Sequence, residues 1–247
     1  MQKMQLFSAI ADFYEYSMKL NCDYEKWADY VADKLRSLAG KTGKGIDAAC
    51  GSGYFTRALK RAGYNVCGVD CSAEMLTAAM RECAKDRLVI DFRKEDMSNL
   101  KSFEKVDFIT VINDGINCIP PEKIEKTFRS FACCLKKGGV LHFDVSSEYK
   151  LRNVIANQTF FEDDENYSYI WFNTLHEDRV CMDMSVFLRQ GEYYKKTESS
   201  LTEYIHTQEK LSDALEECGF KIVCVEGQSG EKLTEESERL CFWAVKN

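Results

Sequence analysis

The chain has 247 residues, a net charge of −7 and 45% hydrophobic residues, which is an ordinary composition for a globular protein. It contains no apolar run near the ~20 residues that span a bilayer and no basic segment with an apolar core at its start, so we expect no membrane partner and a cytoplasmic location. A negatively charged chain without a basic stripe also argues against nucleic acid, because phosphate contacts dominate nucleic-acid affinity.

Cysteine is frequent in this chain, with 12 residues, but no two of them have the spacing Cys-x-x-Cys. Several fall inside apolar runs, among them Cys67, Cys83 and Cys241. Since no spacing supports a metal site or a redox pair, we expect reduced, mostly buried thiols and no bound metal.

Residues 1–40 are predicted to form a helical segment that precedes the main fold. Trp27, Tyr30 and Leu35 belong to an apolar stripe with helical spacing. Tyr14 lies upstream of this stripe, among other aromatic residues, and is a candidate for covering a bound ligand.

Residues 45–62 predict a strand, a glycine turn and a helix. An apolar run ends at Asp47, and Gly51 and Gly53 follow before a helical pattern begins. Glycines let a ligand approach the backbone, and the free N–H groups of a helix start favour an anionic group. The third glycine of a dinucleotide fingerprint is replaced by Thr56, and a Walker lysine is absent. Asp47 would repel a phosphate and suits a ligand that carries an ammonium group.

The next elements continue the alternation of strand and helix. A strand at 65–70 ends in Asp70, and an acid at this point of a βαβ unit accepts hydrogen bonds from ribose hydroxyls. A helix should follow from Ser72, which is a suitable N-cap. A third strand is predicted at 88–92.

The most apolar strand is predicted at 106–112, as expected for the buried centre of a parallel sheet, and it ends at Asn113. A helix is predicted to begin at Pro120-Pro121 and to carry an apolar face as far as Leu135. The glycines that follow it lead into a fifth strand at 140–145.

Residues 146–206 interrupt the alternation. Residues 167–172, 180–188 and 193–202 alternate apolar and polar side chains, which predicts an inserted antiparallel meander of about three short strands. Because this insertion leaves from the edge of the sheet where ligands bind, we expect it to act as a lid. A helix and two strands in residues 207–247 should then complete the main sheet.

Five short features occur in a fixed order along the chain: Asp47-Ala48-Ala49-Cys50-Gly51-Ser52-Gly53, Asp70, Asp96-Met97, Asn113-Asp114 and Gly138-Gly139. In this order and spacing they resemble the motifs of the class I S-adenosylmethionine-dependent methyltransferases. The resemblance covers residues 24–145 well and residues 207–245 by pattern only. It implies an α/β fold with a Rossmann-like, doubly wound, mainly parallel sheet, an antiparallel C-terminal strand and the inserted meander. Residues 1–145 and 207–247 would form the cofactor-binding domain, and residues 146–206 the lid.

The resemblance further implies S-adenosylmethionine as the cofactor, with Asp70 on the ribose, Asp96 on the adenine amino group and Met97 against the ring. The residues expected at the cofactor are Tyr14, Asp47, Ala49, Gly51, Gly53, Asp70, Cys71, Met75, Asp96, Met97 and Asn113.

The expected reaction is in-line methyl transfer to a small molecule, in which the protein supplies orientation and excludes water. The chain lacks the Pro-Pro-aromatic motif after Asn113 that marks enzymes methylating base nitrogens, and it lacks the Pro-Cys of cytosine-5 enzymes. None of His142, His176 and His206 stands out as a base, so no catalytic residue is assigned. The acceptor, the methylated atom and the choice between monomer and dimer stay open.

Two alternatives remain at this point. The chain would also suit a non-catalytic protein that binds S-adenosylmethionine as a sensor or partner, although its intact carboxylates argue against lost function. An NAD-type oxidoreductase is disfavoured by Thr56 in place of the third fingerprint glycine.

Overall fold

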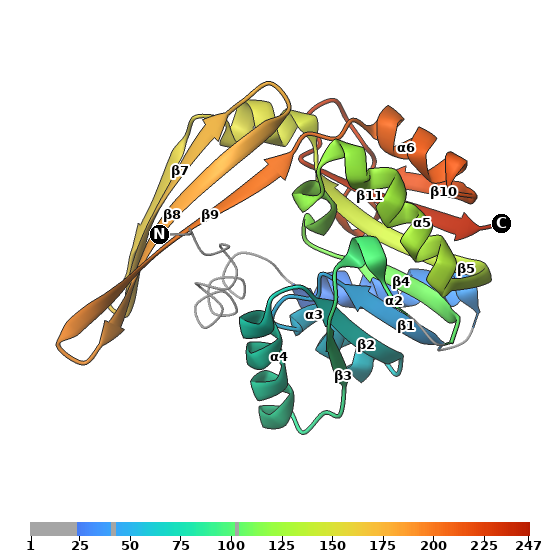
Figure 1. The fold of residues 1–247 in the computed structure, drawn as a ribbon, viewed down its shortest axis with the longest axis horizontal. Helices are drawn as coiled ribbons and strands as arrows, with labels where there is room; N and C mark the ends of the chain where they lie inside the picture. Colours follow the sequence, from blue (N-terminus) through green and yellow to red (C-terminus); the bar gives the residue numbers. More distant parts are fainter. Residues whose placement is uncertain (1–23, 41–42, 102–103) are drawn as a thin grey trace.

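The computed structural model describes residues 24–40, 43–101 and 104–247, which form two β-sheets with helices packed around the larger one (Figure 1). The strands of the larger sheet are β1 (Lys44–Ala48), β2 (Asn65–Asp70), β3 (Asp91–Lys94), β4 (Val106–Val111), β5 (Leu135–Ser146), β10 (Phe220–Glu226) and β11 (Arg239–Lys246). The α-helices are α2 (Tyr24–Ala39), α3 (Tyr54–Arg61), α4 (Ala73–Lys85), α5 (Ile124–Cys134) and α6 (Gln208–Glu217). Shorter helical turns are η1 (Met97–Asn99), η2 (Gly115–Cys118), η3 (Pro121–Lys123), η4 (Lys150–Ile155) and η5 (Gln228–Gly230).

The larger sheet has the order β10-β11-β5-β4-β1-β2-β3. Strands β1 to β5 pair in parallel, whereas β11 is antiparallel to both β5 and β10. The predicted central strand is confirmed, because β4 lies in the middle of the sheet and Ile109 and Val111 are completely buried. The Rossmann-like, doubly wound fold with an antiparallel C-terminal strand is therefore confirmed as well.

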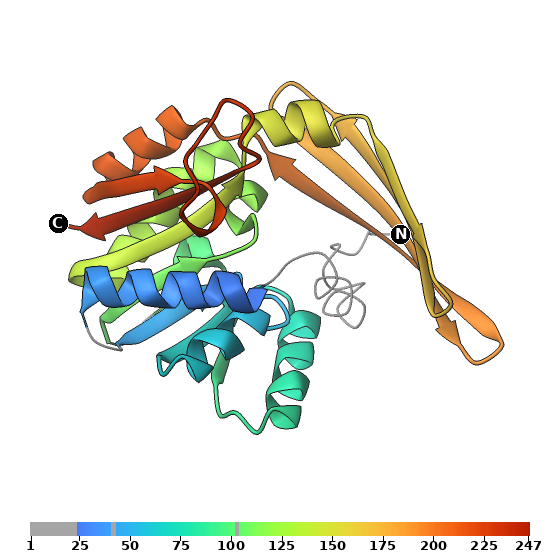
Figure 2. The ribbon, with the colours of Figure 1, turned by 180° about the vertical axis from the view of Figure 1, so that it is seen from behind.

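Helices cover both faces of this sheet. The face with α5 and α6 lies in front in Figure 1, and Phe128 and Phe131 of α5 pack there against β5. The opposite face carries α2 and α3, which lie in front in Figure 2, and Trp27 and Leu35 of α2 are buried against it. Each helix thus buries one apolar stripe, which the helical spacing in the sequence predicts.

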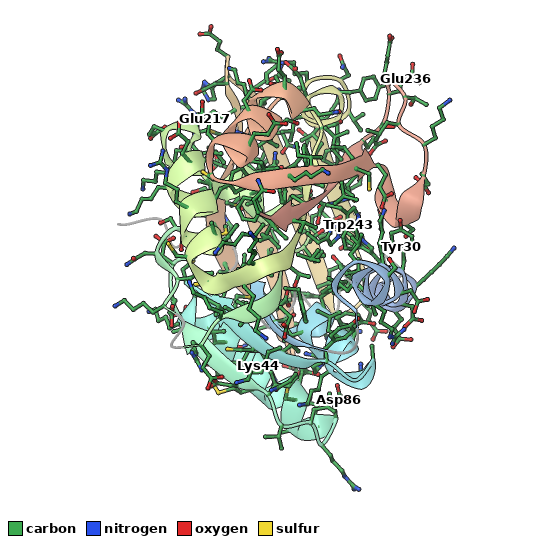
Figure 3. All side chains as sticks on the ribbon, turned by 90° about the vertical axis from the view of Figure 1, so that its right-hand side faces the viewer. Tyr30, Lys44, Asp86, Glu217, Glu236 and Trp243 are labelled. Carbon is green, nitrogen blue, oxygen red and sulfur yellow. The ribbon has the colours of Figure 1, made fainter. Side chains whose placement is uncertain are left out.

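A polar network fixes α2 to the C-terminal hairpin. Tyr30 of α2 and Trp243 of β11 both donate to Glu226 Oε1, at 2.5 and 2.9 Å, and Lys34 donates to Glu226 Oε2 at 2.5 Å. Figure 3 shows Tyr30 and Trp243 on neighbouring elements. Tyr30 and Lys34 have the Tyr-x-x-x-Lys spacing of an oxidoreductase acid–base pair, but here they hold helix to strand.

The smaller sheet consists of β6 (Thr159–Asp163), β7 (Tyr167–Leu175), β8 (Arg179–Gln190) and β9 (Tyr193–Tyr204), in that order and antiparallel throughout. It has four strands instead of the expected three. The additional strand is β6, which the sequence did not indicate because it is mostly exposed and shows no alternation. The sheet projects from the main body, and its far turn lies well away from the larger sheet (Figures 1 and 2).

Two further details differ from the sequence expectations. The third strand begins at Asp91 and not at Leu88, and the preceding Arg87 has a φ of 55°. The described residues between β3 and β4 form only the short turn η1. A pocket of about 380 Å³ is lined by residues of β1, β2 and β3 and by residues of this connection, among them Leu100 and Glu104. None of the helices in the described ranges is long and apolar enough to cross a membrane.

Candidate functional site

The carboxyl ends of β1, β2 and β4 meet at one edge of the larger sheet, where open α/β sheets bind ligands. Between β1 and α3 the chain turns through three left-handed residues, Ala49, Gly51 and Gly53, with φ of 56°, 54° and 73°. A side chain at Gly115 would approach the Ala49 side chain to 3.1 Å, so the loop after β4 lies directly against this turn. The turn after β1 and the carboxyl ends of β2 and β4 form the candidate site.

Asp70, the last residue of β2, joins two parts of the site. Its Oδ2 accepts the Gly51 N–H and its Oδ1 accepts the Ser72 N–H, both at 2.8 Å. Burial raises the pKa of Asp70, although these backbone donors oppose the shift. Since each carboxylate oxygen has two lone pairs, Asp70 keeps acceptor capacity for a ligand beyond the loop that it holds.

Asp96 and Met97 lie after β3, at the same edge. Asp96 Oδ1 accepts the Ser98 N–H at 2.8 Å and thereby caps η1. Asp96 Oδ2 has no hydrogen-bond partner among the described residues, and Met97 beside it is buried. This pair combines a free acceptor with an apolar surface, which suits a planar ring with an amino group.

Asp47, in β1, is buried and accepts hydrogen bonds from two threonine hydroxyls. Thr56 donates to its Oδ2 at 2.6 Å and Thr110 to its Oδ1 at 2.8 Å, and the residue is only 1% exposed. Burial raises the pKa of Asp47 to about 6, while the two hydroxyls oppose the shift. The carboxylate therefore ties α3 and β4 to β1, and its contact with a ligand's ammonium group stays a prediction.

The other expected cofactor residues lie near the same turns, with one exception. Met75 is buried in the first turn of α4, where its N–H is capped by Ser72, and Cys71 is exposed beside Asp70. Asn113 ends β4 with a φ of 67°. Tyr14 lies outside the described residues.

Sequence reasoning missed a buried ionic cluster next to Asn113. Asp144 of β5 accepts the Asn113 N–H at 2.7 Å, and Arg239 of β11 binds both Asp144 and Asp114. Burial alone raises the pKa of Asp114, but Arg239 and Lys150 outweigh it and hold the pKa below its usual value. Burial raises the pKa of Asp144 to about 6 despite Arg239. Only Asp144 could have been noticed in the sequence, because it interrupts an apolar strand, whereas Arg239 is the first residue of β11.

Glu203, near the end of β9, brings the smaller sheet to this cluster. Its side chain is buried, and burial followed by repulsion from Asp114 raises its pKa to about 8. The end of β9 is fixed by Asn117 of η2, which donates to the Tyr204 carbonyl at 3.0 Å. The sequence did not indicate Glu203, because no motif contains it and the charged residues that act on it are distant along the chain.

The histidines of the described chain have structural surroundings. His142 is buried and stacks on Trp243 at 3.8 Å between ring centroids, and burial lowers its pKa to about 4. His206 contacts the Ile119 carbonyl through Nε2 at 3.0 Å, and burial lowers its pKa. His176 lies in the turn between β7 and β8.

Comparison with known proteins gives a consistent result. A family model described as a methyltransferase domain matches residues 46–139. The crystal structure of an S-adenosylmethionine-dependent methyltransferase from Clostridium acetobutylicum ATCC 824 is similar with a TM-score of 0.90 and 30% identity, covering 96% of this chain and 98% of that chain. YqeM of Bacillus subtilis (strain 168), named as a methyltransferase, is 29% identical, with 98% of each chain covered. A protein of Geobacillus sp. (strain WCH70), also named as a methyltransferase, is 30% identical, with 94% of this chain and 97% of that protein covered.

Proposed function

Because this chain belongs to the class I S-adenosylmethionine-dependent methyltransferases, an enzyme family, we propose that it methylates a small molecule at the carboxyl edge of its larger sheet. Its cofactor is S-adenosylmethionine and its reaction is methyl transfer. The observation that carries the proposed site is Asp70, which closes β2 and at the same time orders the glycine turn through Gly51.

The residues at this edge fit the cofactor. Asp70 would accept the ribose hydroxyls with its remaining lone pairs, and Asp96 Oδ2, which lacks a partner among the described residues, would accept from the adenine amino group. Met97 would cover the ring. Gly51 and Gly53 remove side chains from the turn, so that the methionine part of the cofactor can approach the backbone.

The chemistry divides between cofactor and protein. S-adenosylmethionine supplies an activated methyl group, which an acceptor lone pair takes in line as the carbon–sulfur bond breaks. The chain's own residues hold the two reactants in one geometry and exclude water, which can lower the barrier by roughly 7–11 kcal/mol. The left-handed Ala49 and Asn113, from neighbouring strand ends, fix the loops on either side of the proposed reaction centre.

A small acceptor is supported by the position of the smaller sheet. The Asn117 hydrogen bond to Tyr204 brings the end of β9 over the end of β4, and Asn117 also donates to Ser146 of β5 at 3.2 Å. In this proposal the base of the smaller sheet is the lid of the acceptor site. The free thiols of all described cysteines support a reducing compartment, the cytoplasm.

The experiment is a screen with S-adenosylmethionine that carries a tritiated methyl group. The purified chain is incubated with a small-molecule extract, a protein extract and RNA, and label is counted in each. Label in the small-molecule fraction alone supports the proposal. Cofactor binding without label in any fraction favours the sensor or partner alternative.

A further inference from the structure

The inner face of the smaller sheet carries three buried polar atoms without a hydrogen-bond partner in the described residues. They are Trp171 Nε1, Asn173 Oδ1 and Glu203 Oε2. The strand register puts them on one face, because Trp171 pairs with Met184, Asn173 with Met182 and Glu203 with Val180 along β8. A buried polar atom left unpaired costs about 1–3 kcal/mol, and of these three Glu203 Oε2 belongs to the residue beside the ionic cluster, where a polar ligand could pair with it.

Glu203 is the charged member of this set and is 8% exposed. The charges that act on it are Asp114, Asp144, Arg239 and Lys150. Arg239 is bound to both aspartates, and Lys150 acts on Glu203 without a direct ion pair within 4.0 Å among the described residues. The three carboxylates thus face two cations, and the group that lacks a bound counterion is Glu203.

Cys118 relates Glu203 to the cofactor site. Burial raises the pKa of Cys118, and the carboxylates that raise it further include both Glu203 and Asp70. The contacts agree with this, because Asn117 of η2 donates to the carbonyl of Tyr204, next to Glu203, at 3.0 Å. Gly115 at the start of η2 lies against Ala49 of the glycine turn. Glu203 approaches the same edge of the larger sheet as Asp70, from the lid side.

We propose that the methyl acceptor is an amine, whose ammonium group is bound by the carboxylate of Glu203, the member of this cluster without a bound counterion among the described residues. This inference rests on the proposed function. Glu203 Oε2 takes a proton as one N–H bond of the ammonium breaks, and the freed lone pair forms the new N–CH3 bond. The electron pair of the breaking carbon–sulfur bond stays on sulfur, so the products are a methylated ammonium ion, S-adenosylhomocysteine and a protonated Glu203. A carboxyl group with a pKa near 8 suits this transfer, because its proton affinity is closer to that of an amine than a usual glutamate's.

The first test uses the unaltered protein. A small-molecule extract of Bacillus subtilis cells is divided, and in one half the amines are capped by acetylation. Both halves are incubated with the enzyme and S-adenosylmethionine carrying a tritiated methyl group. We expect capping to remove at least nine-tenths of the transferred label. Equal label in the two halves overturns the inference but leaves methyl transfer to a small molecule intact, whereas no label in either half contradicts the proposed function and the inference together.

The second test compares Glu203→Gln with Glu203→Asp and with the matched control Glu198→Gln, an exposed residue of the same strand. We expect Glu203→Gln to lower label transfer at least 100-fold, Glu203→Asp to recover part of it and Glu198→Gln to match the wild type. Calorimetry should give the same S-adenosylmethionine affinity for all four proteins within twofold. Unchanged transfer by Glu203→Gln, or an equal loss in the Glu198→Gln control, overturns the assignment.

Discussion

Asp70 is the single residue on which the proposed cofactor site depends most. Replacement by Ala removes two backbone hydrogen bonds of the turn and the expected bonds to the ribose. Since a hydrogen bond to a charged group contributes about 1.5–3 kcal/mol, we expect Asp70→Ala to weaken S-adenosylmethionine binding at least about tenfold, measured by calorimetry. Asp91→Ala, at the start of the neighbouring strand β3 and away from the candidate site, serves as the control. Equal affinity of the Asp70 variant and the wild type would show that the ribose binds elsewhere.

Asp47 makes stability depend on pH. Its pKa is about 6 in the folded state and 3.8 as the unperturbed value, so the folded state binds the proton more tightly. A raised carboxyl pKa means that the free energy of unfolding falls as pH rises from about 4 to 6 and is level above that. Between pH 4.5 and 7 we expect the wild type to lose about 2 kcal/mol relative to Asp47→Asn in urea unfolding. Parallel pH curves for the two proteins would contradict the buried-carboxylate interpretation.

At the scale of elements, η2 fastens the smaller sheet to the larger one. Asn117 bonds to Ser146 N–H and to the carbonyls of Ser146 and Tyr204, and it is completely buried. Asn117→Ala leaves these groups without partners, so we expect at least about 2 kcal/mol lower stability and faster hydrogen exchange at the end of β9. Asn166→Ala, in the exposed turn between β6 and β7, should change stability by less than about 0.5 kcal/mol. Equal effects of the two changes would show that the hydrogen bonds of Asn117 do not hold the smaller sheet to the larger one.

A strand or helix could be predicted from the sequence where its own residues show an apolar run or a periodic apolar stripe. β4 is a continuous apolar run and was found within one residue of its observed bounds. The apolar stripe of α5 gave the end of that helix, whereas its predicted start at Pro120-Pro121 falls on the separate turn η3. β6 was missed because its side chains are largely exposed and give no alternation. Periodicity reports burial within one element, so an exposed strand has no pattern to detect.

The partners of the acidic residues at the candidate site could not be predicted, because they come from other strands and helices of the folded chain. Asp47 meets Thr110 because these residues are register partners in β1 and β4, and the register is a property of the assembled sheet. Glu203 interacts electrostatically with Asp114 and Arg239, each of which is 36 or more residues away from it in the sequence. The motifs identified the turn and its acids, whereas the protein groups that surround these acids come from distant strands.

At the scale of the whole molecule, cofactor binding and acceptor binding are assigned to different parts of the chain. The proposed cofactor residues lie on the larger sheet, and the proposed acceptor residue Glu203 lies on the smaller one. Replacing residues 160–204 by a short flexible linker should therefore keep S-adenosylmethionine affinity within about threefold and lower label transfer to the small-molecule extract at least about 100-fold.

A shorter deletion is the matched control for that change. Joining Met184 to Ser199, which are register partners, through a two-residue turn removes the far part of β8 and β9 and keeps Glu203 and its attachment through Asn117. We expect this variant to retain most of the transfer, because only the base of the smaller sheet adjoins the ionic cluster. If the protein that lacks residues 160–204 binds the cofactor and still methylates the extract as well as the wild type does, the smaller sheet is not the lid of the acceptor site.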